Sequence, residues 1–332
     1  MKKKNKVWIF YHSADSDGMS SGFLMKWAVE NGIIIIPRTD AEVGMIPFNY
    51  KWDVPFEKIS NNDLVFWLDV SATSEEMNTL YDKLDGEMIW IDHHESILKD
   101  HFTMHQKCMG YRDFKQAACI NVYEFIKDFG KFNKTTQQQF NNIKPLIDIV
   151  GACDIWDLSL VDGDRDMWCA EYLSVKFALE ANDTDPRTKN GYNFWLDFMV
   201  EDTEEIENMI SDLRYDGNVI QSYMNIRNHD LCNSYGFSAD FEGIRVFAVN
   251  QGIGGSFIFN SINPEKYDAF MCFIKSGKSN QYSVSLYGNN KDINLIDKLK
   301  HIGFSGHAQA GGFKCDTFEI VCKGIDKKIL VN

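Results

Sequence analysis

Short apolar runs alternate with segments of helical periodicity in the first half of the chain. Four of these runs predict strands: KVWIFYH (6–12), GIIIIP (32–37), LVFWLDV (64–70) and EMIWIDHH (87–94). Helices are predicted over 18–32, near 116–129 and near 137–150, and Thr73 with Glu76 forms a capping box that opens a helix through Leu84. Apolar strands that alternate with helices predict an α/β fold whose parallel sheet has flanking helices on both faces.

The pattern changes twice in the second half. Residues 160–230 are mainly helical in periodicity and include the acidic stretch EDTEEIENMI. From about residue 240, three further strands are predicted (244–250, 267–276 and 281–288), followed by a helix over IDKLKH (296–301). We therefore predict an N-terminal α/β domain (1–160), a helical connector (161–235) and a smaller α/β domain (236–332).

Acids and histidines follow the apolar runs at the points where strands are expected to end. They are His12 at the end of the first run with Asp15 and Asp17 after it, Asp69 near the end of the third run, Asp92, His93 and His94 at the end of the fourth, and Asp154 in GACD. Each has an ordinary interpretation by itself, such as a helix cap, a turn or a packed histidine. Together they indicate a site, because ligands bind at the carboxyl ends of strands in parallel sheets.

The chemistry of these side chains indicates a metal centre. The DSDG stretch does not continue as a calcium loop, since Met19 and Lys26 occupy two ligand positions of that motif. Carboxylates mixed with imidazoles suit Mn²⁺, or Mg²⁺, better than structural zinc. Two such cations about 3.5–4 Å apart would share a carboxylate and activate a water for in-line attack on phosphorus.

Composition and charge narrow the class of protein. The chain has 332 residues, 44% of them hydrophobic, and a formal net charge of −14, which opposes binding of long nucleic-acid duplexes. The eight cysteines form no CxxC pair that would indicate a zinc ribbon. Neither a secretory signal nor an apolar run of about 18 residues is evident, so we expect a cytoplasmic protein without a membrane partner.

Four motifs in order, followed by two C-terminal segments, resemble those of a known family. HSADSDG (12–18), WLDVS, IDHH and GACD resemble the four motifs of the DHH phosphoesterase superfamily. YSVSLYGNN and GFSGHAQAGGF (303–313) resemble its C-terminal DHHA1 substrate-binding domain, although Tyr287 stands where many members have an arginine. The resemblance covers nearly the whole chain apart from the helical middle.

The resemblance implies a role for each candidate residue. His12 and Asp15 would hold one Mn²⁺, Asp17 and Asp154 a second, and Asp69 would bridge both. His93 would be a further metal ligand, His94 would face the scissile phosphate, and Asp92 would orient the histidines. Catalysis would rest on His94, Asp92 and Asp69, with Mg²⁺ or Co²⁺ as substitute ions. The substrate would contact His94, His307, Gly311, Gly312 and Ser256.

The expected function is hydrolysis of short oligonucleotides or linear dinucleotides to mononucleotides, in a cleft between the two α/β domains. Three alternatives remain: a 3′-phosphoadenosine bisphosphate phosphatase, a cyclic-dinucleotide phosphodiesterase, and a non-catalytic nucleotide-binding regulator. A homodimer is compatible with the sequence, which does not specify an oligomeric state.

Overall fold

The computed structural model has four N-terminal strands in one parallel sheet, with the order β2-β1-β3-β4. It describes residues 6–35, 42–50, 52–94, 102–200, 202–252, 255–322 and 327–331. The strands are β1 (Lys6–His12), β2 (Glu42–Phe48), β3 (Leu64–Leu68) and β4 (Met88–Ile91). The predicted α/β fold with a parallel sheet is confirmed. The chain divides into two units, residues 1–220 and 221–332, while the predicted three-part division stays a prediction.

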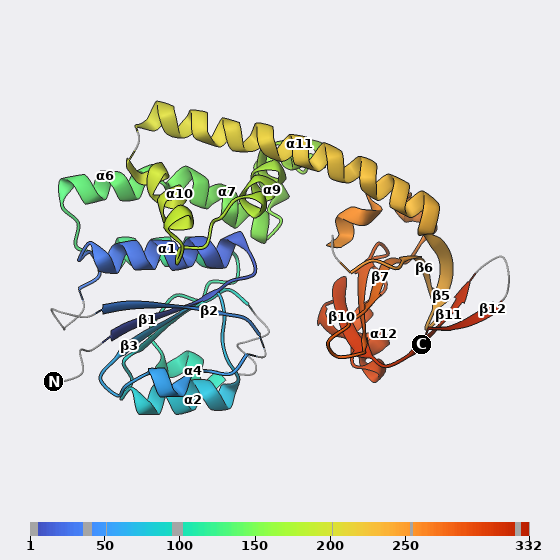
Figure 1. Cartoon of the computed structure of the whole chain (residues 1–332), viewed down its shortest axis with the longest axis horizontal. Coiled ribbons are helices and arrows are strands. Elements are labelled where there is room, and N and C mark those ends of the chain that lie inside the picture. The colour runs from blue at the N-terminus through green and yellow to red at the C-terminus, as the bar shows by residue number, and fades with distance from the viewer. Residues whose placement is uncertain are drawn as a thin grey trace. The chain divides into compact units, whose positions relative to one another are not determined.

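Helices cover both faces of this sheet, as Figure 1 shows within the first unit. Side chains alternate along β1, so that Ile9 and Tyr11 pack on one face and Phe10 on the other. The first face is covered by α1 (Ser16–Glu30) and α5 (Ala118–Phe129), and the same core continues into α7 (Lys144–Asp154), α9 (Ser174–Ala181) and α10 (Lys189–Val200), which pack on these helices. The second face is covered by α2 (Ser74–Lys83) and α4 (Phe102–Lys107). The two-sided burial explains why the strands lack polar alternation.

The remaining helices lie in the middle of the chain. They are α6 (Lys134–Asn142), the short α8 (Arg165–Trp168) and the long α11 (Thr203–Tyr235), which confirm the helical character expected there. The single helix predicted near 137–150 is instead divided between α6 and α7. The division falls at Ile143, and Pro145 occupies the first turn of α7, where its missing N–H is not needed.

The prediction of a strand at GIIIIP is wrong for its described residues, 32–35. The backbone N–H groups of Ile33 and Ile34 both donate to the carbonyl of Ala28, which ends α1 with a turn. Both isoleucine side chains are buried in the core. The second strand lies farther along the chain, in β2, at the edge of the sheet.

The second unit contains an eight-stranded sheet of order β12-β11-β5-β6-β7-β8-β10-β9, in which only β6 and β7 pair in parallel among the described strands. Its strands are β5 (Phe237–Phe241), β6 (Ile244–Val249), β7 (Ala269–Lys275), β8 (Tyr282–Gly288), β9 (Ser305–His307), β10 (Ala310–Cys315), β11 (Phe318–Cys322) and β12 (Lys327–Val331). The three strands predicted here correspond to β6, β7 and β8, and the predicted helix corresponds to α12 (Leu295–Leu299).

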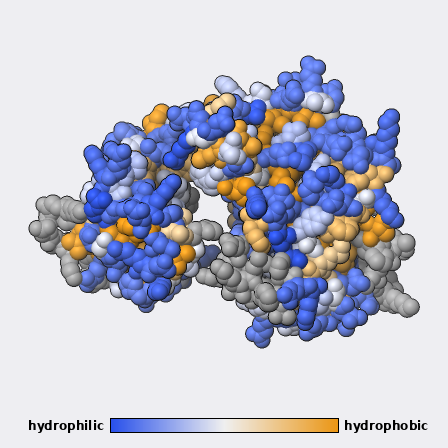
Figure 2. All heavy atoms as spheres, turned by 180° about the vertical axis from the view of Figure 1, so that it is seen from behind, coloured by the Kyte–Doolittle hydropathy of each residue, from blue (hydrophilic) through white to orange (hydrophobic). Residues whose placement is uncertain are grey.

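The surface is mostly hydrophilic on the face drawn in Figure 2, with smaller apolar patches. In the part of the chain that the structure describes, no helix combines the length and apolar character needed to cross a bilayer.

Candidate metal centre

The carboxyl edge of the parallel sheet gathers the acids and histidines of the first unit. His12 ends β1, Asp69 follows β3, and Asp92, His93 and His94 follow β4. Asp15 caps the N-terminus of α1, Asp17 lies in its first turn, and Asp154 is the last residue of α7. Except for Asp92, their ligand atoms form groups of three that lie within 4.8 Å of one another: His12, Asp15 and Asp69; Asp17, His93 and Asp154; and, linking these two, Asp69, His93 and His94.

A glycine allows α1 to approach the end of β1 closely enough to build this edge. A Cβ atom at Gly18 would lie 2.1 Å from the carbonyl oxygen of His12, so that no other residue fits without a shift of the helix. Asp15 accepts a hydrogen bond from the Gly18 N–H at 3.0 Å and thereby starts the helix. The DSDG stretch therefore combines a helix cap with the placement of two acids beside His12.

The first ligand group consists of His12, Asp15 and Asp69. His12 Nδ1 lies 2.9 Å from Asp15 Oδ2 and 3.5 Å from Asp69 Oδ2. The imidazole and the Asp69 carboxylate are almost fully buried. The three side chains thus converge from a strand end, a helix cap and a neighbouring strand.

The second group consists of Asp17, His93 and Asp154. His93 Nε2 lies 3.6 Å from Asp17 Oδ2 and 3.3 Å from Asp154 Oδ2. Asp17 also accepts hydrogen bonds from the backbone N–H groups of Ala118 and Cys119, at 2.9 and 2.6 Å, which cap the start of α5. These bonds fix the orientation of a carboxylate that is 1% exposed.

Asp69 faces both groups. Its Oδ2 atom lies toward His12, while its Oδ1 atom lies 3.4 Å from His93 Nε2. Its backbone adopts a left-handed φ of 60°, a conformation that aspartate tolerates better than most residues. The N–H of Asp69 donates to the carbonyl of Ile91 at 2.9 Å, which holds the turn against β4. One carboxylate oxygen is therefore directed at each ligand group.

Asp92 belongs to none of the ligand groups and instead holds His94. Its Oδ1 atom accepts from the backbone N–H groups of His93 and His94 and lies 2.8 Å from His94 Nδ1. Its Oδ2 atom accepts from Trp90 Nε1 at 3.1 Å. The carboxylate is therefore fully engaged in fixing the backbone of both histidines and the ring of His94.

The donor set fits divalent cations. His12 Nδ1 and Asp69 Oδ1 are buried and make no hydrogen bond with the described residues, since the short contact from His12 to Asp15 lacks hydrogen-bond geometry. Leaving such atoms unsatisfied is costly unless another partner binds them. Oxygen and imidazole donors, grouped in threes with one shared carboxylate, suit a pair of hard or borderline cations.

The pKa values of the site show that a cation would replace bound protons. Burial lowers the pKa of His12 and His93, but the facing carboxylates more than reverse this and raise the pKa values to about 11 and about 10. Burial, and then the charge of Asp69, raises the pKa of Asp154 to about 6 and that of Asp17 well above its usual range. Protons thus neutralise the cluster when no cation is bound, and cations would compete with them.

Two residues that the sequence analysis missed, Asn49 and Tyr50, follow β2 at the same edge. Asn49 Oδ1 lies 3.3 Å from His12 Nε2, which makes Nε2 the donor and leaves Nδ1 free to face Asp15 and Asp69. The Tyr50 hydroxyl lies 3.4 Å from both ring nitrogens of His94. The sequence analysis missed both residues because it predicted the second strand at GIIIIP. The strand that forms is β2, and Asn49 and Tyr50 directly follow its carboxyl end.

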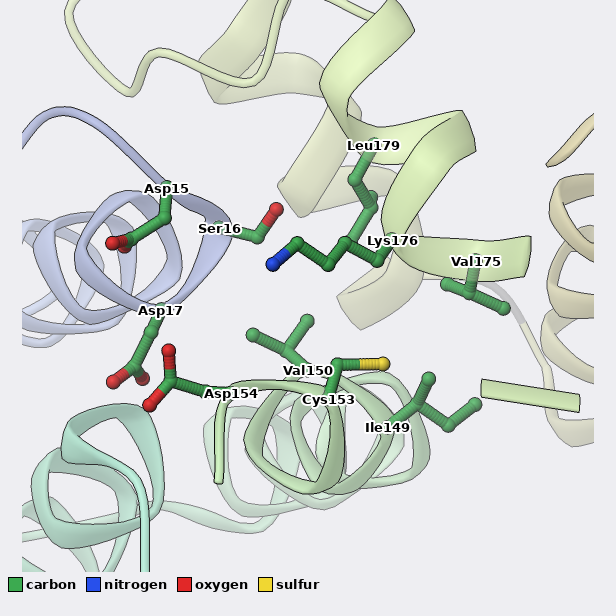
Figure 3. A pocket seen from close by; sticks show the side chains of 10 residues that line it. All are labelled: Asp15, Ser16, Asp17, Ile149, Val150, Cys153, Asp154, Val175, Lys176 and Leu179. Carbon is green, nitrogen blue, oxygen red and sulfur yellow. The ribbon is translucent and has the colours of Figure 1, made fainter. Parts of the chain in front are cut away.

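Lys176 is a third residue that the sequence analysis missed. It belongs to α9 and lines a pocket together with Asp15, Asp17 and Asp154 (Figure 3). The other side chains that line this pocket are largely apolar. In Figure 3 its side chain extends into the pocket toward the side where the Asp15 and Asp17 carboxylates lie. Its nearest acid is Glu180, at 4.0 Å, so its charge is not consumed by a close ion pair among the described residues.

Apart from His94, the predicted substrate-binding residues lie in the second unit. Gly311 and Gly312 belong to β10, where a Cβ atom would lie 2.3 Å from Ser305 O and 2.5 Å from Val284 O, respectively. Close strand pairing therefore explains both glycines. Ser256 lies in a 3₁₀ turn over Gly255–Phe259, and His307 ends β9, but the side chain of His307 lies outside the described residues. The roles of these residues, like those of the metal-centre residues, stay predictions.

A nearby pocket in the second unit contains no charged side chain among its described lining residues. They are Gln251, Gly252, Gly255, Cys272, Ile274, Ser283, Ser285 and Tyr287. Tyr287, at the position where the family often has arginine, is thus part of a neutral, hydrogen-bonding surface.

Comparisons with known proteins agree with this architecture. The family model described as "DHH family, N-terminal domain" matches residues 6–151. No curated protein matches the chain in a sequence search. The fold is similar to that of an exopolyphosphatase-related protein from Bacteroides fragilis, with a TM-score of 0.50 and 12% identity over 94% of this chain and 87% of that one.

Two further solved structures align less closely. PggH from Vibrio cholerae, titled a pGpG-specific phosphodiesterase, has a TM-score of 0.44 and 12% identity over 93% of each chain. RecJ from Thermus thermophilus, in complex with Mn²⁺, has a TM-score of 0.45 and 13% identity over 94% of this chain and 49% of that one.

Proposed function

We propose that this chain, whose residues 6–151 match the N-terminal domain of the DHH family, is a phosphoesterase that hydrolyses short oligonucleotides or linear dinucleotides to mononucleotides with two Mn²⁺ ions. The observation that carries the proposal is that Asp69 lies between two ligand groups, with one oxygen toward His12 of the first and the other toward His93 of the second. When bound, the cations would supply charge stabilisation and an activated water for attack on phosphorus. His12, Asp15 and Asp69 would hold one of them, and Asp17, His93, Asp154 and Asp69 the other.

The protein's own residues have separate tasks around this centre. Asn49 holds the tautomer of His12, and Asp92 holds the ring of His94 through its Nδ1–H. The side chain of His94 is 30% exposed, so its Nε2 edge is accessible to a phosphate group. The pKa of His94 is raised, because Asp92 outweighs the effect of burial, which favours a protonated ring that stabilises negative charge or protonates a leaving oxygen.

Two features support a short nucleotide substrate. The net charge of −14 disfavours a long polyanion, whose binding depends on many lysine and arginine contacts. The neutral pocket of the second unit offers serine, glutamine and tyrosine groups, which suit a base or a ribose better than a second phosphate. A cyclic dinucleotide, a 3′-phosphorylated adenosine bisphosphate and simple binding without turnover are the outcomes that compete with this proposal.

The test is a matched substrate panel with manganese: a 5′-phosphorylated RNA dinucleotide, a 24-mer, cyclic di-AMP, adenosine 3′,5′-bisphosphate and pyrophosphate. We expect the dinucleotide to be converted to mononucleotides fastest. His93→Ala should abolish turnover, whereas His301→Ala, which removes an exposed histidine of the second unit, should not. Faster hydrolysis of another substrate of the panel would replace the proposed substrate class. Binding of a substrate without hydrolysis of any member of the panel would favour a regulatory nucleotide-binding protein.

A further inference from the structure

Tyr50 lies at the exposed rim of the metal centre. It is 38% exposed, and its ring centroid lies 5.4 Å from that of His12 and 5.8 Å from that of His94. It therefore contacts the imidazole of one ligand group and the histidine expected to face the substrate. No motif singled it out, because it follows an edge strand that the apolar pattern did not reveal.

The hydroxyl of Tyr50 makes only long hydrogen bonds to His94. It lies 3.4 Å from both ring nitrogens, and the two rings meet at 79°. Equal distances mean that the hydroxyl is not aligned with either nitrogen, and Nδ1 is already engaged by Asp92 at 2.8 Å. Among the described residues the hydroxyl has no other hydrogen-bond partner. The hydroxyl can therefore exchange a long contact with His94 for a shorter hydrogen bond to a group that arrives from solvent.

The surrounding charges define what that group would be. Asp15, Asp69 and Asp92 each direct an oxygen at an imidazole nitrogen of a neighbouring histidine, so these acceptors are already engaged and the Tyr50 hydroxyl is the donor beside them. The Tyr50 hydroxyl and His94 Nε2 lie 3.4 Å apart, so a single oxygen can lie about 2.8 Å from the hydroxyl while it stays beside the ring of His94. A non-bridging oxygen of a phosphate group meets this geometry.

We propose that Tyr50 is a substrate-binding residue of this centre, whose hydroxyl donates a hydrogen bond to a non-bridging phosphate oxygen beside His94. The inference deepens the proposed function and rests on it for the identity of the bound group. It assigns the phosphate contact to a neutral donor, which adds no charge to compete with cations for the carboxylates.

The test compares Tyr50→Phe, which keeps the ring and removes only the hydroxyl, with Tyr81→Phe. Tyr81 lies on α2, and its hydroxyl donates to the carbonyl of Lys107 at 3.4 Å, outside the metal centre. Loss of one hydrogen bond to a charged group should lower kcat/KM for the dinucleotide by about 10- to 150-fold. Two further readouts are binding of adenosine 5′-monophosphate by calorimetry and the imidazole ¹⁵N spectrum of His94 in metal-free protein.

Support requires that Tyr50→Phe lowers kcat/KM and weakens nucleotide binding, while the His94 signals and the Tyr81→Phe enzyme stay like the wild type. Changes below about twofold in both quantities would overturn the proposal. Shifted His94 signals in metal-free Tyr50→Phe would also overturn it, since the hydroxyl would then act by positioning His94.

The two proposals can fail separately. If the wild type hydrolyses none of the panel but binds the nucleotide more tightly than Tyr50→Phe, the proposed function falls and the phosphate contact stands. Equal nucleotide binding by the two proteins overturns the contact whether or not turnover occurs, and absence of both binding and turnover overturns both.

Discussion

Replacing Asp69 by asparagine should weaken both proposed cation sites at once. The two oxygens of this carboxylate face different ligand groups, whereas Asp15 belongs to one group only. Asp15→Asn should therefore leave the group of Asp17, His93 and Asp154 able to bind a cation. The difference between the two variants in stabilisation by manganese therefore tests whether both cation sites use Asp69.

The expected magnitude follows from linkage. A cation at 100 times its Kd stabilises the folded state by about 2.7 kcal/mol, so two cations contribute about 5.4 kcal/mol. The first unit of 220 residues has an unfolding entropy of about 0.46 kcal/mol/K, which converts these values to shifts in Tm of about 6 °C and about 12 °C. If Asp69→Asn weakens each site about 100-fold, the same manganese concentration contributes only about 0.8 kcal/mol, or about 2 °C.

The assay is thermal unfolding with manganese and with a chelator, together with the binding stoichiometry from calorimetry. Asp63→Asn is the matched control, because Asp63 is equally buried but accepts from Lys6 N, Trp8 Nε1 and Ser60 N away from the site. It should lower the Tm of the metal-free protein and keep the full manganese shift. A shift of about 6 °C in Asp69→Asn, equal to that of Asp15→Asn, would refute the shared carboxylate.

Three further predictions concern separate parts of the structure. Asn49→Leu should weaken manganese binding by about 10- to 100-fold because the tautomer of His12 is no longer held, and unchanged affinity by calorimetry would contradict this role. Gly18→Ala should destabilise the protein by about 1–3 kcal/mol in urea unfolding, since its Cβ meets the His12 carbonyl at 2.1 Å; a loss below about 0.5 kcal/mol would count against the close approach. Arg245 holds the pKa of Asp268 well below its usual range, so their pair stabilises the fold above about pH 4 and this contribution is lost as the pH falls. Asp268→Asn should cost about 1 kcal/mol at pH 7 and less as the pH falls below about 4; a cost as large at pH 2 as at pH 7 would contradict the assignment.

The second strand shows where the apolar pattern fails. An apolar run indicates burial, and Ile33 and Ile34 are indeed buried, but their N–H groups complete the turn after α1 instead of pairing in the sheet. The strand that does pair, β2, contains Gly44 and Pro47 and is only half-buried over most of its length. Proline and partial exposure are tolerated there because β2 lies at the sheet edge. The sequence pattern could not distinguish these two cases.

The sequence by itself determined the parallel sheet and the convergence of its strand-end acids and histidines. Residues buried on both faces identify the strands, and parallel strands bring their carboxyl ends to one edge whatever the helices between them do. Only the tertiary structure decided that each oxygen of Asp69 faces a different ligand group and that Asn49, Tyr50 and Lys176 join the site. Such placements depend on contacts between segments far apart in the chain, which local periodicity does not encode.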